Sequence, residues 1–128
     1  MIKGSCLCGS VQYDITGKID DIVHCHCGTC RKAHSAAFSS VAAVQDKDFR
    51  LLSSDSLKSY ESSKGKSRYF CGDCGSQIYA KRINTPHIVL RLGTLDSKID
   101  AVEQAHIWVS EKADWFHLES QLPTNPEF

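Results

Sequence analysis

The chain has 128 residues, and its 15 Lys and Arg residues balance its 15 Asp and Glu residues, so the formal net charge is zero. This length predicts a single domain over residues 1–128, because the chain is too short for two independent cores. Zero net charge argues against binding to nucleic acid or to an acidic membrane surface. The longest apolar run is Val41–Val44, far below the roughly 20 residues of a membrane span, so we expect a cytoplasmic protein that does not enter the membrane.

A two-residue alternation of apolar and polar side chains dominates the sequence. Val11, Tyr13 and Ile15 alternate with polar neighbours and predict a first strand at 11–16. Further β-rich runs lie at 38–44, 49–52, 57–60, 68–70, 77–81, 88–93 and 104–109. Only 31–37 is expected to form a helical turn. The pattern therefore predicts a mainly β fold of short strands with little helix, as in a sandwich or an open barrel.

The stretch from Ser53 to Ser67 is rich in Ser and Lys. We expect it to form an exposed hairpin arm or loop within the domain. Its basic residues, with the one that follows it, are then expected to form a solvated face: Lys58, Lys64, Lys66 and Arg68.

Seven cysteines are the unusual feature of the sequence. Their number is odd and no export signal precedes them, so a disulfide framework is not expected and metal ligation or thiol chemistry is. They form three groups, Cys6-Leu7-Cys8, Cys25-His26-Cys27-Gly28-Thr29-Cys30 and Cys71-Gly72-Asp73-Cys74. The last group has the form of a zinc knuckle, since a two-residue spacer lets both thiolates reach one ion and the glycines permit the tight turn.

Seven thiolates divide most completely into four and three. The middle group can hold one zinc ion by itself through Cys25, Cys27 and Cys30. The other two pairs then make a closed structural site for a second zinc ion, with the ligands Cys6, Cys8, Cys71 and Cys74. Such a site would pin the first strand to a central hairpin.

Two alternatives to this division stay open. His24, His26 or His34 can be a fourth ligand of the middle group, although an extended segment turns His24 and His26 away from Cys25 and Cys27. The Cys6 and Cys8 pair can instead join the middle group, which would leave Cys71 and Cys74 as a lone pair.

A zinc ion with three protein ligands and an open fourth position has the usual layout of a catalytic site. Three thiolates leave that centre with a net charge near −1, which weakens its power to acidify water. A soft thiol ligand is still favoured in the fourth position and would be held there as a thiolate. Chemistry that makes or breaks a carbon–sulfur bond is therefore favoured over hydrolysis.

The chain resembles a known family at these residues. The runs Gly4–Gly9, Cys25–Lys32 and Phe70–Gly75, together with His106-Ile107-Trp108, Lys112, Trp115 and Leu122-Pro123, are similar to the glutathione-dependent formaldehyde-activating enzyme family, which includes centromere protein V. The resemblance spans about residues 3 to 126. It implies a β-tent fold with two zinc ions, one structural and held by Cys6, Cys8, Cys71 and Cys74, the other catalytic and held by Cys25, Cys27 and Cys30.

The family reaction joins glutathione and formaldehyde into S-hydroxymethylglutathione. The resemblance thus implies a zinc-dependent carbon–sulfur lyase that acts on glutathione or a related thiol–aldehyde adduct. Donors to the developing alkoxide are sought near the middle cysteines, at Arg31, Lys32, His26 and His34. Trp108, Trp115 and Phe116 are either core residues or the wall of a pocket. The alternative function is a non-catalytic two-zinc β module for protein interaction or for thiol or zinc sensing.

Overall fold

The computed structural model describes residues 1–128, and short strands make up most of its regular structure. The strands are β1 (Ile2–Ser5), β2 (Gln12–Ile15), β3 (Ile22–Cys25), β4 (Ser39–Gln45), β5 (Phe49–Ser53), β6 (Leu57–Ser63), β7 (Lys66–Cys71), β8 (Gln77–Arg82), β9 (His87–Arg91) and β10 (Glu103–Ile107). One α-helix, α1 (Gly28–His34), and the short 3-10 helices η1 (Asp46–Asp48), η2 (Leu92–Thr94) and η3 (Val109–Glu111) complete the fold. The prediction of a mainly β fold with little helix is confirmed.

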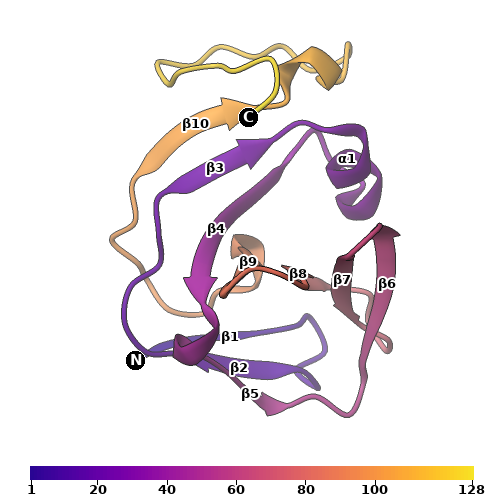
Figure 1. The fold of residues 1–128 in the computed structure, drawn as a ribbon, viewed down its shortest axis with the longest axis vertical. Helices are drawn as coiled ribbons and strands as arrows, with labels where there is room; N and C mark the ends of the chain where they lie inside the picture. Colours follow the sequence, from indigo (N-terminus) through magenta and orange to yellow (C-terminus); the bar gives the residue numbers. More distant parts are fainter.

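The strands form two sheets. The smaller sheet has the order β1-β2-β5, and the larger has the order β10-β3-β4-β9-β8-β7-β6. Every pair of neighbouring strands is antiparallel except β3 and β10, which are parallel. Figure 1 shows β1, β2 and β5 together at one side of the molecule, with β3, β4 and β10 leading away from them toward α1. This arrangement agrees with a tent-shaped fold.

The apolar core lies between the two sheets. Its fully buried side chains come from both, with Tyr13 and Ile15 from β2, Ile78 from β8 and Leu90 from β9. The alternation that predicted a strand at 11–16 is confirmed for β2, although Asp14 is also buried because Arg50 of β5 donates two hydrogen bonds to its carboxylate, at 3.2 and 2.8 Å. Burial of a carboxylate is tolerated when a guanidinium pairs with it in this way.

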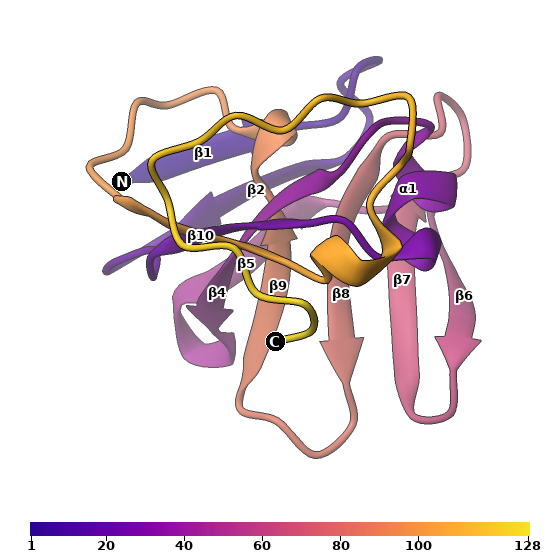
Figure 2. The same cartoon turned by 90° about the horizontal axis from the view of Figure 1, so that it is seen from above.

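Pairing registers place one set of side chains on the face of the large sheet that lies opposite the core. Val23 and Cys25 of β3 share this face with Val41 of β4, which pairs with Arg91 of β9. Directly paired residues project to the same face, and residues two apart on one strand do likewise. Figure 2 shows β9, β8, β7 and β6 side by side, with α1 beside β7, where Arg68 contacts Cys30.

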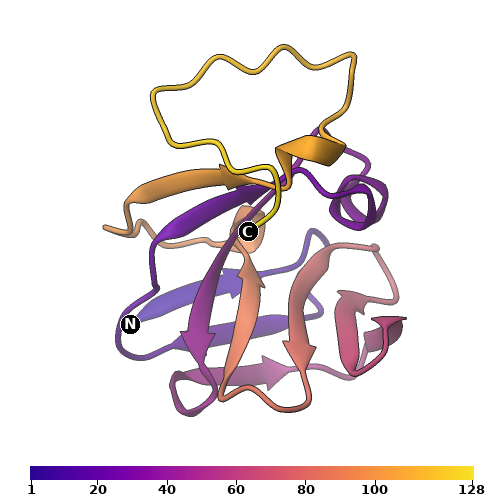
Figure 3. The same ribbon diagram turned by 45° about the horizontal axis from the view of Figure 1, so that its top comes forward.

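Two further segments lie at the two edges of the large sheet, which are formed by β6 and β10. Residues 53–67, expected as an exposed hairpin arm or loop, include β6 and lead into the hairpin that β6 forms with β7. After β10 the chain turns back, so that His106 N–H donates to Pro123 O and Asn125 N–H donates to His106 O, at 3.0 and 2.9 Å. Figure 3 shows this C-terminal segment lying over β10. No helix in the chain has the length and apolar character needed to cross a bilayer.

Candidate metal centres and the adjoining pocket

The fold brings the seven cysteines together as four and three. The sulfurs of the four-cysteine set (Cys6, Cys8, Cys71 and Cys74) all lie within 4.8 Å of one another. Those of the three-cysteine set (Cys25, Cys27 and Cys30) do the same. Each set can hold a metal ion. Cys6 and Cys8 do not join the middle group, so the alternative division of the cysteines is not found.

Local turns build the four-cysteine set. Cys6 follows β1, and Cys71 ends β7 just before a turn in which Gly75 has a φ of 81° and donates its N–H to Cys71 O. The Cys6–Cys8 and Cys8–Cys71 sulfur distances are 3.6 and 3.8 Å. Tetrahedral zinc with bonds of about 2.3 Å separates its sulfurs by roughly 3.8 Å, so these distances fit a zinc ion.

Hydroxyl groups around this set favour the thiolate form that metal binding requires. The Ser10 and Ser56 hydroxyls lie 3.3 and 3.4 Å from Cys71 Sγ, and these hydrogen bonds lower the pKa of Cys71 to about 5. The Ser76 hydroxyl lies 3.3 Å from Cys74 Sγ and lowers the pKa of Cys74 to about 7. Both thiols therefore ionise at a lower pH than an ordinary cysteine does.

The three-cysteine set lies where β3 ends and α1 begins. Cys27 is the N-cap of α1, and its Sγ accepts a hydrogen bond of 3.3 Å from Cys30 N–H. This helix starts three residues before the predicted helical turn and ends earlier, at His34, because Ser35 adopts a left-handed conformation with φ 51°. Hydrogen bonds from Cys25 and Cys27 lower the pKa of the Cys30 thiol, and Ser39 and the charge of Arg91 act in the same direction.

The three candidate histidine ligands lie outside the three-cysteine set. His24 contacts Ser40 Oγ and Glu103 Oε2 at 2.8 and 2.6 Å, and His26 Nε2 lies 2.8 Å from His106 Nδ1. Burial lowers the pKa of His26 to about 4. His34 is partly buried, its Nε2 has no hydrogen-bond partner, and burial followed by the charge of Arg91 lowers its pKa to about 4.

A pocket of about 390 Å³ adjoins the three-cysteine set and is lined by all three of its cysteines. We call it the cysteine pocket. Its other lining residues include four cations and two aromatic residues, Lys66, Arg68, Arg82, Arg91, Trp108 and Phe128. The volume falls in the range of small-molecule sites, which is about 300–1,000 Å³. None of the four-cysteine set lines this pocket, so the two sets differ in the space beside them.

Arg68 corrects a prediction made from the sequence. Lys58 and Lys64 are exposed, as expected of a solvated face, but Lys66 is half-buried and Arg68 is buried. The guanidinium nitrogens Nη1 and Nη2 of Arg68 lie 4.0 and 3.9 Å from Cys30 Sγ, and its Nε donates to Ser62 Oγ at 3.0 Å. The hairpin of β6 and β7 folds back beside α1, and this long-range contact leaves no local trace in the sequence.

Residues proposed as donors or pocket walls are only partly found at the pocket. Arg31 and Lys32 do not line it, and Arg31 Nε instead donates to Glu111 O at 3.1 Å. Trp108 lines it, with Phe128 packed against its ring at a centroid distance of 5.2 Å. Trp115 is exposed, and Phe116 packs near His26 and Phe38.

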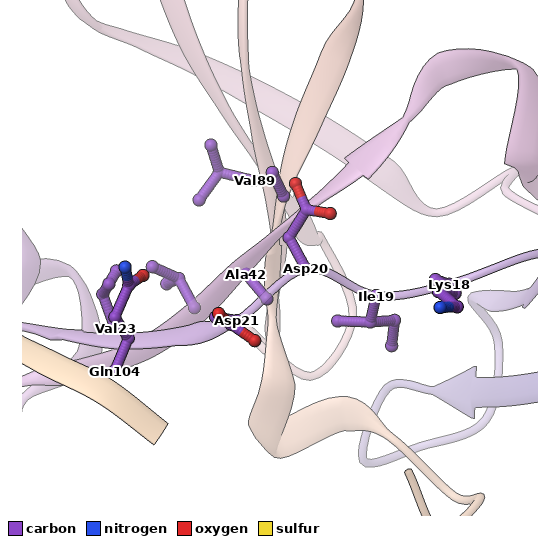
Figure 4. Close-up of a pocket in the computed structure, with 10 residues that line it drawn as sticks. Lys18, Ile19, Asp20, Asp21, Val23, Ala42, Val89 and Gln104 are labelled. Carbon is purple, nitrogen blue, oxygen red and sulfur yellow. The ribbon is translucent and has the colours of Figure 1, made fainter. Parts of the chain in front are cut away.

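A larger hollow of about 570 Å³ on the same face offers no comparable chemistry. Figure 4 shows it beside the segment that leads into β3, with the side chains of Lys18, Ile19, Asp20 and Asp21 among its lining. Val41 and Val89 line both hollows. No cysteine or histidine lines this second one. The cysteine pocket is therefore the candidate reaction site.

Comparison with known proteins agrees with this geometry. Residues 1–111 match the family model described as glutathione-dependent formaldehyde-activating enzyme. The chain belongs to this family. The resemblance noted from the cysteine motifs is thereby confirmed.

Two individual proteins show further similarity. An uncharacterized lyase of Schizosaccharomyces pombe is 29% identical over 77 residues, which cover 60% of this chain and 55% of that protein. The chain thus matches about half the length of this curated relative. A crystal structure of a Rhodobacter sphaeroides protein superposes with a TM-score of 0.64 at 22% identity, covering 77% of this chain and 91% of that one, and it shows the same fold.

Proposed function

We propose that the protein is a zinc-dependent carbon–sulfur lyase that makes and breaks the bond between a thiol sulfur and an aldehyde carbon. The observation that carries the proposal is the difference between the two cysteine sets. The four-cysteine set supplies a full tetrahedral set of ligands, whereas the three-cysteine set has no fourth protein ligand and opens on a pocket. We assign a structural zinc to the first and a catalytic zinc to the second.

Cys25, Cys27 and Cys30 would hold the catalytic zinc ion, which would supply a position for a thiol ligand and favour its thiolate form. The cysteine pocket would hold the adduct beside these sulfurs. In the cleavage direction the carbon–sulfur bond breaks with its electron pair on sulfur, the hydroxyl of the adduct loses its proton, and the carbonyl forms. The thiolate is the leaving group, and the proton passes to solvent.

Positive charge around the pocket suits this chemistry. Arg68 and Arg91 lie close to the three-cysteine set, and a nearby cation stabilises both a thiolate and a developing alkoxide. Trp108 and Phe128 provide apolar surface at the pocket, against which the carbon atoms of the adduct would pack. Glutathione and formaldehyde are the substrates that the family description suggests.

Exchange NMR with glutathione and isotope-labelled formaldehyde tests the proposal. The zinc-loaded protein should increase the rate at which free formaldehyde and the S-hydroxymethyl adduct exchange, above the rate in buffer. The Cys27→Ser variant should lose this effect because the three-cysteine set is broken. Unchanged exchange rates with the wild-type protein, for glutathione and for simpler thiols, would contradict the proposed activity.

A further inference from the structure

Two basic residues face each other at the cysteine pocket. Lys66 of β7 and Arg82 of β8 are direct register partners, and both line the pocket together with the three-cysteine set. Like charges placed opposite each other on antiparallel strands are destabilising. A contribution to the stability of the β7–β8 hairpin therefore does not explain why these two cations lie opposite each other.

No acidic side chain neutralises these cations. The ion pairs of the chain are His24–Glu103, Arg50–Asp14, Lys81–Asp46 and His117–Glu119, and none includes a cation of the pocket. Glu111 is the one acidic residue in the pocket lining, and its Oε1 accepts a hydrogen bond of 2.8 Å from Gly28 N–H. Four cationic side chains and one acidic side chain thus line the same pocket, which favours an anionic ligand.

The two cations nearest the three-cysteine set, Arg68 and Arg91, have the charge of the cysteine thiolates as their partner. Arg68 contacts Cys30 Sγ, and Arg91 is 4% exposed, with its Nε and Nη2 buried and without hydrogen-bond partners. A buried guanidinium without a carboxylate needs negative charge nearby. Three thiolates around a divalent ion, joined by a fourth thiolate from a substrate, would supply a charge near −2, and the two guanidiniums balance it.

The other two cations of the pocket, Lys66 and Arg82, form an outer pair that has no such partner within the protein. Lys66 is half-buried and Arg82 is exposed, and neither side chain makes a hydrogen bond or an ion pair. Burial, followed by the charges of Arg68, Arg91 and Arg82, lowers the pKa of Lys66. An anion between the outer pair would relieve this repulsion, and a guanidinium offers the planar geometry that suits a carboxylate.

We propose that Lys66 and Arg82 bind a carboxylate of the substrate, so that the site selects anionic thiols over neutral thiols of the same size. This inference rests on the proposed function, because it places the substrate sulfur at the three-cysteine set in the same pocket. It adds a substrate class and two specificity-determining residues to that function.

Calorimetric titration of the zinc-loaded protein with mercaptopropionate and mercaptopropionamide tests the inference. The two thiols have nearly the same shape and differ in charge. The carboxylate should bind about tenfold more tightly than the amide, which is the effect of one charge-assisted contact. Equal affinities would overturn the inference and leave the proposed function standing. If neither of these thiols, nor glutathione, binds, the proposed function fails as well.

Charge-removing variants identify the residues. Lys66→Gln and Arg82→Gln should each reduce the preference for the carboxylate severalfold and leave the affinity for the amide unchanged, a result that general damage to the fold would not produce. Lys64→Gln is the matched control, because it removes the same charge from an exposed site on the same hairpin, outside the pocket. An equal loss of preference in the control would mean that only overall charge matters and would overturn the assignment.

Discussion

Arg68 and Cys71 lie on the same strand, β7, and contact different cysteine sets. The guanidinium of Arg68 lies 3.9 Å from Cys30 Sγ, and Cys71 Sγ lies 3.8 Å from Cys8 Sγ. One strand thus joins both candidate metal centres. The position of Arg68 depends on the anchoring of β7 at Cys71, so damage at the four-cysteine set should reach the three-cysteine set more readily than the reverse.

This dependence predicts an asymmetric loss of metal. Cys27→Ser should remove about one equivalent of zinc and keep the fold, because the four-cysteine set stays complete. Cys71→Ser should remove both equivalents and much of the folded structure, since a structural zinc contributes roughly 10 kcal/mol or more to folding. Elemental analysis and circular dichroism of the purified variants measure the two quantities.

Two results would argue against this interpretation. Loss of both metal ions and of the fold in Cys27→Ser would show that the three-cysteine set is itself structural. Retention of one full equivalent in Cys71→Ser, with a native spectrum, would show that the anchoring of β7 does not depend on the metal.

Arg68→Gln is predicted to weaken metal binding at the three-cysteine set by about 10–100-fold, as changes beside metal ligands commonly do. The reason is loss of the positive charge next to Cys30 Sγ. Chelator competition measures the affinity of each site. The four-cysteine set should keep its affinity in the same protein and serves as an internal control, so a parallel loss at both sites would point to misfolding instead.

The sequence alone was sufficient for the grouping of the cysteines and for most strands, because both depend largely on local spacing. Alternation identified β2, and short spacers brought Cys71 close to Cys74. Pairing of Cys6 and Cys8 with a hairpin far along the chain followed from counting ligands. The helix was placed late by three residues, since its N-cap is a cysteine, which is not a residue that commonly marks a helix start.

The cations of the pocket could not be found in this way. Arg68 lies in a polar stretch that looks solvated, and its burial follows from the packing of the β6–β7 hairpin beside α1. Arg91 alternates with the core residues of β9 and so projects to the opposite face of the large sheet. The three-cysteine set lies on that face. Both placements depend on contacts between segments that are distant in the sequence, and periodicity carries no information about them.

Two buried tyrosines predict a loss of stability at high pH. Burial raises the pKa of Tyr13 and of Tyr79 from 10 to about 12. Between these values the unfolded chain releases the phenolic protons while the folded chain keeps them, so the free energy of unfolding falls as pH rises. The stability that the two protonated phenols contribute is fully present below pH 10, and it is lost as the pH rises through the folded-state pKa of about 12.

Absorbance of the phenolate at increasing pH measures the effect, together with denaturant melts at each pH. Tyr79→Phe should remove one of the late-ionising groups and flatten the fall in stability. The phenolate absorbance that this variant lacks should be the part that appears near pH 12 in the wild-type titration. If the missing part appears near pH 10 instead, burial does not control the ionisation of Tyr79.

Gly4 and Tyr13 are register partners on β1 and β2, and the ring of Tyr13 occupies the space that a side chain at Gly4 would need. The ring is 1% exposed and its hydroxyl lies 2.7 Å from Thr94 Oγ1, so it cannot move aside without breaking packing and a hydrogen bond. Gly4→Ala should therefore lower the free energy of unfolding by about 1–3 kcal/mol. Gly93→Ala is the control, because no neighbouring heavy atom lies within 4 Å of an added methyl group there, and its effect should stay within about 0.5 kcal/mol. Denaturant unfolding of the zinc-loaded proteins compares the two, and equal midpoints would show that Tyr13 can leave its place at little cost.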